Sequence, residues 1–270
     1  MRRLKDHWVA AVIGTLVLVF LYVPIVYTFV NAFNANKNML SWGGATLEWF
    51  AKTFASDSFW EAFVQSITIA AIVAVLSAII SVCAAVGVRE FGKRFQTVQS
   101  SCMYLRLTLP EVILATGVMA CVTALPGVKL GPTWVVLVQT LVYSAYALVI
   151  IQARMTTIAS LYEDAAYDLG ASTRRVLTSV VLPLLGPSIF VGALLAFTFS
   201  LDAVVSTTFL GGPTTETLPL LIMSLIKKGT TPQVNAIGMV VTLFNLAVLA
   251  VSIKAVGVKN TASAIAGGSN

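Results

Sequence analysis

Histidine is nearly absent from this sequence of 270 residues, and cysteine is scarce. The one histidine, His7, precedes the first apolar run, so the chain cannot assemble a histidine zinc site or a histidine-based triad. The cysteines Cys83, Cys102 and Cys121 are odd in number and have no C-x-x-C spacing. We expect them to be small buried apolar side chains, and we expect no catalytic or metal-ligating residues.

Charged residues are also few, at 10% of the chain, while 58% of the residues are hydrophobic. This balance does not fit a soluble domain, whose surface needs more polar side chains. The net charge of +6 comes from basic residues scattered between apolar runs rather than gathered on one face. The composition therefore indicates a membrane protein that does not bind nucleic acid.

Six apolar stretches are long enough, or nearly so, to cross a hydrocarbon core about 30 Å thick, which takes about 20 helical residues. The first follows Arg2, Arg3 and Lys5 like a signal peptide, but its apolar part is too long and no small-x-small cleavage site ends it. It is expected to remain as a span. We therefore predict an all-α polytopic membrane protein with six transmembrane helices, at about 8–31, 63–88, 97–125, 133–153, 184–208 and 235–257.

The basic residues predict the orientation of these spans. An even number of spans puts both termini on one side, and cytoplasmic segments carry the excess of arginine and lysine. With the N-terminus inside, eleven basic residues fall in inner segments. Only five fall outside: Lys37, Lys52, Lys129, Lys227 and Lys228. We therefore expect both termini, and the segment 154–183, to be cytoplasmic.

The stretch GVREFGKR (87–94) matches the glycine and lysine positions of a phosphate-binding P-loop. It places Arg94 where that motif needs Ser or Thr to hold magnesium, and it follows a membrane span instead of a strand. A basic cytoplasmic loop is the simpler interpretation. We therefore expect no cofactor in this chain, and any ATP must bind another polypeptide.

The stretch EDAAYDLGASTRRVLTSVVLP (163–183) is charged and turn-prone and lies between two spans. A helical pattern precedes Gly170, which can take the left-handed conformation that ends a helix because it has no Cβ. Ser172 or Thr173 offers a side-chain oxygen to cap a second short helix that runs toward Pro183, where the next span begins. We therefore expect a helix-turn-helix on the cytoplasmic surface.

This stretch resembles the EAA loop of ABC importer permeases, written E-A-A-x3-G-x9-I-x-L-P, with Asp164 for the glutamate and Val180 for the isoleucine. In that family the loop is a coupling helix that inserts into a groove of the cytoplasmic ATPase. The resemblance implies the type I ABC importer permease fold. It also implies that a separate ABC ATPase dimer holds ATP and magnesium, while this chain is not an enzyme. The coupling residues that it implies are Glu163, Asp164, Ala165, Ala166, Gly170, Leu182 and Pro183.

An ordinary amphipathic cytoplasmic helix ended by a glycine is the alternative. It would explain the helix and its charges, but not the fixed distance from Gly170 to Leu182 and Pro183. It would also not explain the paired alanines, Ala165 and Ala166, that keep one face small. At the rim of an ATPase contact we expect ion pairs from Glu163, Asp164 or Arg174.

Other stretches resemble the spermidine/putrescine-type permeases of that family. LTLPEVILATG (107–117) resembles their third span. LDAVVSTTFLGGP (201–213) and TLPLLIMSLIKKGTTPQVNAIG (217–238) resemble their last two spans and the connecting loop. With the Y-x-P-I pattern that begins at Tyr22, the likeness covers most of the chain and implies a bacterial inner-membrane protein.

The resemblance also implies partners. One chain of six spans cannot enclose a two-fold pathway, so a second permease subunit is expected. The resemblance to the polyamine systems favours a related but different chain over a second copy of this one. The outer segments 34–62 and 209–234 would dock an extracytoplasmic substrate-binding protein. Membrane lipid would surround a single permease domain at 1–260, and residues 261–270 have too little apolar content to fold, so we expect a flexible cytoplasmic tail.

Two carboxylates, Glu111 and Asp202, lie within predicted spans, where an ionised group costs about 2.5–3.5 kcal/mol on insertion scales. Pro110 has no N–H to give the Arg106 carbonyl, so it should kink or break the third helix and expose backbone oxygens. These acids and oxygens, with aromatic faces, would stabilise a polyamine or another organic cation. The aromatic residues expected along this pathway are Trp134, Tyr143, Tyr146 and Phe199.

Packing is the alternative role for each of these residues. Arg106 would neutralise Glu111 or Asp202 in an internal ion pair, and the aromatic side chains would be interface anchors or packing residues. The second span also carries a stripe of small residues that fits helix–helix packing: Ala70, Ala74, Ala78, Ser81 and Ala85.

Ala203 departs from the polyamine pattern, which commonly has a second acid at this position. One fewer negative charge would hold a dication less firmly, so another small solute stays open. An ion-coupled secondary transporter would also use intramembrane acids and broken helices, but the sequence has no convincing internal repeat with matching interruptions. A membrane-embedded enzyme is a third class, without a histidine cluster or H-E-x-x-H to support it.

Overall fold

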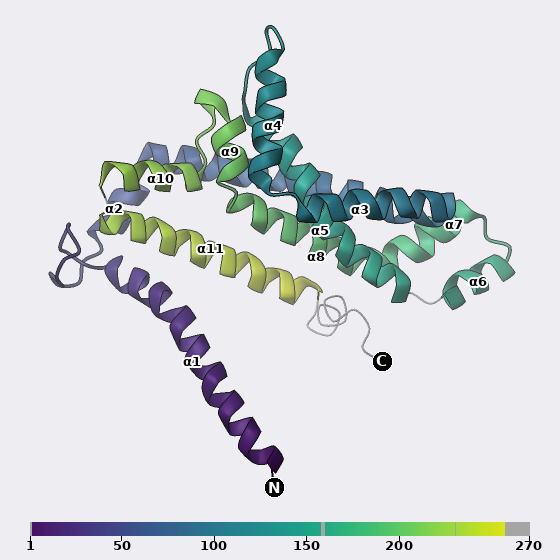
Figure 1. Ribbon diagram of the computed structural model, residues 1–270, viewed down its shortest axis with the longest axis horizontal. Coiled ribbons are helices and arrows are strands. Elements are labelled where there is room, and N and C mark those ends of the chain that lie inside the picture. The colour runs from purple at the N-terminus through teal and green to yellow at the C-terminus, as the bar shows by residue number, and fades with distance from the viewer. Residues whose placement is uncertain (1, 158–159, 230, 257–270) are drawn as a thin grey trace. The chain divides into compact units, whose positions relative to one another are not determined.

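The computed structural model describes residues 2–157, 160–229 and 231–256, and these residues are almost wholly helical (Figure 1). Their one strand-like contact is an isolated antiparallel bridge between Asn34 and Ala45. The helices are α1 (Arg2–Asn31), α2 (Glu48–Phe54), α3 (Asp57–Thr108), α4 (Glu111–Ala124), α5 (Pro132–Thr157), α6 (Ser160–Asp168), α7 (Thr173–Val176), α8 (Leu182–Leu201), α9 (Val205–Leu210), α10 (Leu218–Lys228) and α11 (Pro232–Val256). A π-helical turn, Leu177–Val181, joins α7 to α8, and a 3-10 turn, Gly212–Thr214, follows α9.

Among the described residues, five helical segments are long and apolar enough to cross a membrane, and a bent pair of helices makes a sixth candidate. The straight candidates are Trp8–Asn31, Asp57–Val88, Pro132–Thr156, Thr173–Leu201 and Pro232–Val251. The bent pair joins Phe91–Thr108 to Glu111–Ala124 at 100°. The all-α prediction is confirmed, and six spans result when the bent pair is counted as one.

The third predicted span, 97–125, is broken beside Pro110, as its sequence predicts. Pro110 has an extended backbone, with φ −58° and ψ 135°, and it separates α3 from α4. Proline cannot donate a helical hydrogen bond and disfavours a helical conformation at Leu109. Within α3, Gly92 has φ 73° and ψ −163°, a conformation that strains any L residue, and it separates the second span from the third.

The fifth span differs from the predicted interval of 184–208. Its helix begins at Thr173, runs through the π-helical turn and α8, and stops at Leu201. Pro183 therefore lies within the helical stretch, in the first turn of α8, rather than ahead of it. The π-helical turn ends two residues before this proline, whose missing N–H interrupts the α-helical hydrogen-bond ladder. The three residues 202–204 then interrupt the predicted fifth span, 184–208, and they separate α8 from α9.

The described residues form two compact units, one drawn from those within 2–60 and 221–246 and the other from those within 61–220 and 247–256. In the first unit, the segment after α1 folds around Asn34, whose side chain is 2% exposed. The Asn34 Oδ1 accepts from the backbone N–H groups of Asn36 (2.9 Å) and Gly43 (3.0 Å). The indole N–H of Trp49 donates to the Asn34 carbonyl at 2.9 Å, which ties α2 to this segment.

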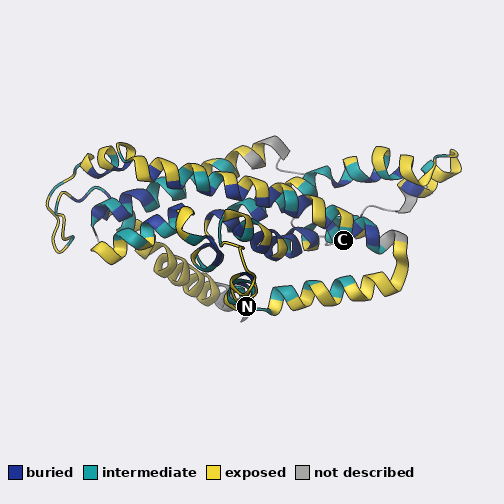
Figure 2. Cartoon of the chain, turned by 90° about the horizontal axis from the view of Figure 1, so that it is seen from above, coloured by how far each residue is buried: buried dark blue, intermediate teal, exposed yellow. Residues whose placement is uncertain are grey.

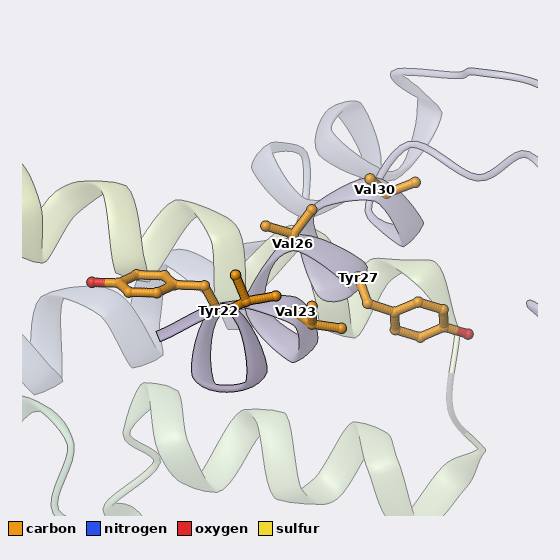
Figure 3. Close-up of a pocket in the computed structure, with 6 residues that line it drawn as sticks. Tyr22, Val23, Val26, Tyr27 and Val30 are labelled. Carbon is orange, nitrogen blue, oxygen red and sulfur yellow. The ribbon is translucent and has the colours of Figure 1, made fainter. Parts of the chain in front are cut away.

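Helix α1 is apolar, and its side chains from Trp8 to Tyr27 are exposed on this chain. Figure 3 shows valine and tyrosine side chains, from Tyr22 to Val30, that line an open hollow along α1. Such a surface is expected of a helix that faces lipid or another membrane subunit.

The second unit is built around α5, which packs along α8. Figure 2 shows its buried residues on the faces that helices turn toward one another. Gly192 of α8 lies so close to α5 that a Cβ added to it would be 3.1 Å from the Ala147 Cβ. The Ser81 hydroxyl donates to the Ser144 carbonyl at 2.8 Å, which joins α3 to α5. The predicted packing stripe is confirmed, because all of its members are buried: Ala70, Ala74, Ala78, Ser81 and Ala85.

The three cysteines differ from the prediction. Cys83, Cys102 and Cys121 are free thiols that are exposed on the outward faces of α3 and α4, rather than buried. An apolar side chain in a spanning helix can face lipid instead of a protein core, so low polarity does not predict burial within the chain. The predicted tail, 261–270, lies outside the described residues.

Candidate functional site

The predicted coupling segment folds as a helix, a glycine turn and a second helix. Helix α6 ends at Asp168, and Gly170 takes the left-handed conformation with φ 79°, as predicted. The Gly170 N–H donates to the Tyr167 carbonyl at 2.8 Å, and the Ala171 N–H donates to the Ala166 carbonyl at 3.0 Å. These bonds satisfy carbonyls that the end of α6 leaves without helical partners.

The second helix of the segment, α7, begins at Thr173 and has Ser172 as its N-terminal flanking residue. Neither side chain caps it: Ser172 makes no side-chain capping bond, and its carbonyl accepts from the N–H groups of Arg175 (2.8 Å) and Val176 (3.0 Å). The predicted side-chain cap is therefore wrong. The turn is held by backbone hydrogen bonds instead.

The coupling segment has one anchored side and one exposed side. Ala166 and Ala171 pack against a buried cluster that α7 and α8 form with α5, including Val176 and Leu185. The exposed residues of the segment include Asp164, Ala165, Asp168, Leu169, Gly170, Arg174 and Pro183. Leu182 is half-buried.

Glu163 departs from the prediction of a rim residue, because its side chain is only 4% exposed. It lies one residue before Asp164, so the helix turns the two carboxylates to different sides. Asp164 and Arg174 keep the exposure that an ion pair at a partner's rim would need.

The predicted substrate-pathway residues gather around two helix breaks in the second unit. Glu111 begins α4 directly after the first break, and Asp202 lies in the second, between α8 and α9. The Oε1 atom of Glu111 accepts a hydrogen bond from the Ser206 N–H, in the first turn of α9, at 3.3 Å. A helix N-terminus has N–H groups without helical partners and a partial positive charge, so the two breaks complement each other.

The two acids therefore have different surroundings. Glu111 is half-buried and bonded to α9, whereas Asp202 is exposed and has no side-chain hydrogen bond among the described contacts. The next residue, Ala203, is 6% exposed and belongs to the apolar core cluster of the unit. A second acid at this position would enter that core, which explains why the packing here suits alanine.

Three polar residues that the sequence did not single out connect the two sides of the second break. The Gln139 Nε2 donates to the Ser206 Oγ at 3.0 Å, and the Ser200 Oγ donates to the Gln139 Oε1 at 2.5 Å. All three are buried. The available signal was a lone glutamine in the apolar stretch WVVLVQTLVY (134–143), since a polar side chain in a span needs a partner.

The four predicted aromatic residues meet in one apolar cluster. Tyr143 is buried within it, and Trp134, Tyr146 and Phe199 pack against it. The ring centre of Phe199 lies 5.8 Å from that of Tyr143 and 5.2 Å from that of Tyr146, with the latter pair edge to face. These contacts join α5 to α8 and correspond to the packing role. The half-buried edges of Tyr146 and Phe199 remain accessible.

Arg106 does not neutralise either acid in this structure. Across the part of the chain that the structure describes, the one ion pair is between Lys52 and Glu48, at 2.5 Å. The Nε and Nη2 atoms of Arg106 are buried without a hydrogen-bond partner in the described chain. The same residues contain no group of three or more His, Cys, Asp or Glu side chains that could hold a metal.

Comparison with known proteins identifies the family of this chain. Residues 77–257 match the family described as "Binding-protein-dependent transport system inner membrane component". The chain belongs to this family. It is the membrane-spanning permease subunit of an ABC importer, so it is a transport component and not an enzyme.

Similar curated proteins are permeases of polyamine systems. The spermidine/putrescine transport system permease protein PotC of Haemophilus influenzae is 34% identical over 236 residues, 87% of this chain and 91% of that protein. The putrescine transport system permease protein PotI of Escherichia coli K12 is 33% identical over 226 residues, 81% of this permease and 80% of that protein.

A solved structure confirms the type I permease fold. The permease resembles a chain in the crystal structure of a bacterial ABC transporter involved in the import of the acidic polysaccharide alginate, with a TM-score of 0.72. The match covers 94% of this chain and 97% of that chain at 18% identity, so the likeness concerns the fold alone.

Proposed function

We propose that this permease moves a polyamine, spermidine or putrescine, into the cell. The names of its relatives PotC and PotI support this substrate class, and so does the exposed carboxylate at the break in the fifth span. That carboxylate is the observation on which the proposal depends. Another small solute is the alternative, because Ala203 gives the pathway one fewer acid than the polyamine pattern has.

The position of Asp202 favours a cation for a physical reason. It follows the last residue of α8, where the helix has carbonyl oxygens without helical partners and a partial negative charge. A carboxylate and such carbonyls attract an ammonium group together, and interrupted helices near the membrane midplane supply this arrangement in transporters. Glu111 instead bonds to the start of α9, so its role in the proposal is to hold the break.

The coupling segment would transmit motion from the ATPase. Its exposed residues Asp164, Ala165 and Leu169 would seat in a groove of one subunit of a cytoplasmic ABC ATPase dimer, and the small Ala165 would allow close approach. ATP and magnesium would bind the ATPase and not this chain. Closure of the ATPase dimer on ATP would move the segment and expose the pathway to the opposite side of the membrane.

The rest of the complex follows from the same proposal. A second, different permease subunit would complete the pathway, and an extracytoplasmic binding protein loaded with polyamine would dock on the outer segments 34–62 and 209–234. Both termini would be cytoplasmic in the bacterial inner membrane. The single permease domain at 1–260 stays a prediction.

The test uses the full complex reconstituted in lipid vesicles, with its binding protein loaded with spermidine, putrescine or another small solute. ATP hydrolysis should rise with a polyamine-loaded binding protein, and Asp202→Asn should lower spermidine uptake at least about tenfold, which corresponds to about 1.4 kcal/mol. The control is Asp202→Glu, which keeps the negative charge at the same position and should retain uptake. Stimulation by a different solute alone, or full uptake by Asp202→Asn, would refute the polyamine proposal.

A further inference from the structure

Gln139 contacts both helices that flank the interruption of the fifth span. Its side chain, 1% exposed, extends from α5 and bonds to Ser200 in the last turn of α8 and to Ser206 in the first turn of α9. One amide group therefore joins the two sides of the interval 202–204, with its oxygen toward α8 and its nitrogen toward α9.

These two bonds are specific for the broken form of the span. In a continuous α-helix, six residues rise about 9 Å and rotate by about 240°, so Ser200 and Ser206 would lie on different faces. A single glutamine amide spans only a few ångströms and cannot bond to both. The bonds can form together only when the helix is interrupted between the two serines.

The interruption also decides which way its residues face. Asp202 is exposed and Ala203 is 6% exposed within the apolar core, although the two are adjacent. We infer that Gln139 is a positioning residue that stabilises the interruption, and so keeps Asp202 exposed and Ala203 buried. Nothing in the local sequence 200–206 requires this pairing, since Gln139 is 67 residues away from Ser206.

Thiol labelling tests this inference by measuring the accessibility of positions 202 and 203, and it needs no assumption about the substrate. Cys83, Cys102 and Cys121 are exposed and are first replaced by alanine. Single cysteines are then placed by Asp202→Cys or Ala203→Cys, and the assembled complex in membranes is treated with a cationic methanethiosulfonate reagent. The cysteine at 202 should react fast and the cysteine at 203 slowly, because the latter is accessible only when the interruption is lost.

Gln139→Leu removes both bonds and keeps a similar side-chain volume. Each buried hydrogen bond shifts the equilibrium between the interrupted and the uninterrupted span by about 2- to 12-fold. The labelling rate at 203 relative to that at 202 should therefore rise at least about fivefold. The matched control is Gln152→Leu on the same helix, which removes a 3.0 Å bond from Gln152 to Gln99 away from the breaks. It should leave the ratio unchanged.

Ser200→Ala removes one of the two bonds and provides a milder test if Gln139→Leu does not assemble. It should raise the ratio about twofold or more. An unchanged ratio in the variants that assemble, or an equal rise in Gln152→Leu, would overturn the inference.

A transport measurement deepens the proposed function and rests on it. In the chain with Asp202 intact, Gln139→Leu should raise the spermidine concentration that half-saturates uptake at least about fivefold, while a purely structural defect would lower only the maximal rate. Absence of polyamine uptake by the unchanged complex would refute the proposed substrate. The inference about Gln139 would not be affected, because the labelling ratio does not depend on the substrate.

Discussion

Gly170 offers the clearest test of how the coupling segment is built. Its φ of 79° lies in the left-handed region, and a Cβ added to it would have no atom within 4 Å. A substituted side chain therefore meets open space, and its cost is that of the backbone alone. An ordinary L residue in this conformation costs about 1–2 kcal/mol, which lowers the population of the native turn by a factor of about 5–30.

The left-handed backbone of Gly170 predicts that different substitutions there impair ATP hydrolysis to different degrees. Gly170→Asn should be the mildest change, because asparagine tolerates the left-handed region, and Gly170→Ala should be intermediate. Gly170→Val should be the most severe, since a β-branched residue is the least compatible with positive φ. The assay is ATP hydrolysis by the reconstituted complex with loaded binding protein, accompanied by co-purification of the ATPase subunit.

The matched control is Gly117→Ala in α4. Gly117 also has open space around its Cβ position, but its backbone is helical, so alanine should be tolerated. If Gly170→Val hydrolysed ATP as well as the unchanged complex, or if Gly170→Asn were as impaired as Gly170→Val, the turn would not couple the subunits in the way described.

Two further substitutions test the packing and the partner surface. Gly192→Val should lower the Tm of the purified complex, at a cost of about 1–3 kcal/mol in stability. The reason is that even the first added carbon, Cβ, would lie 3.1 Å from the Ala147 Cβ. An unchanged Tm would contradict the close approach of α5 and α8. Ala165→Trp should insert into the membrane normally, since Ala165 is exposed, but bind the ATPase at least about tenfold more weakly, or by about 1.4 kcal/mol. Normal ATPase co-purification would contradict the coupling role.

Several features of the fold were predictable because they depend on neighbouring residues alone. Apolar runs predicted the spans, the missing N–H of Pro110 predicted the break before α4, and the absence of a Cβ predicted the left-handed turn at Gly170. The predicted start of the fifth span, at Pro183, was wrong, because a π-helical turn continues the preceding helix into α8.

Burial was less predictable than secondary structure. Apolar cysteines face outward, and the acidic Glu163 is buried, because in a spanning or partner-bound chain polarity does not say which face meets the chain's own core. The same limit applies to the aromatic residues. Their types fit both a pathway and a packed cluster, and the ring contacts of Tyr143 with Phe199 come from helices that are distant in the sequence.

The sequence by itself determined where the chain is apolar enough to span a membrane and where the coupling motif lies, because both depend on residues close together along the chain. Only the tertiary structure decided that Asp202 is exposed while Glu111 bonds to α9, and that Gln139 joins the two sides of a broken span. These contacts connect residues 95 and 67 positions apart. They arise from the packing of α4, α5, α8 and α9, which no local pattern encodes.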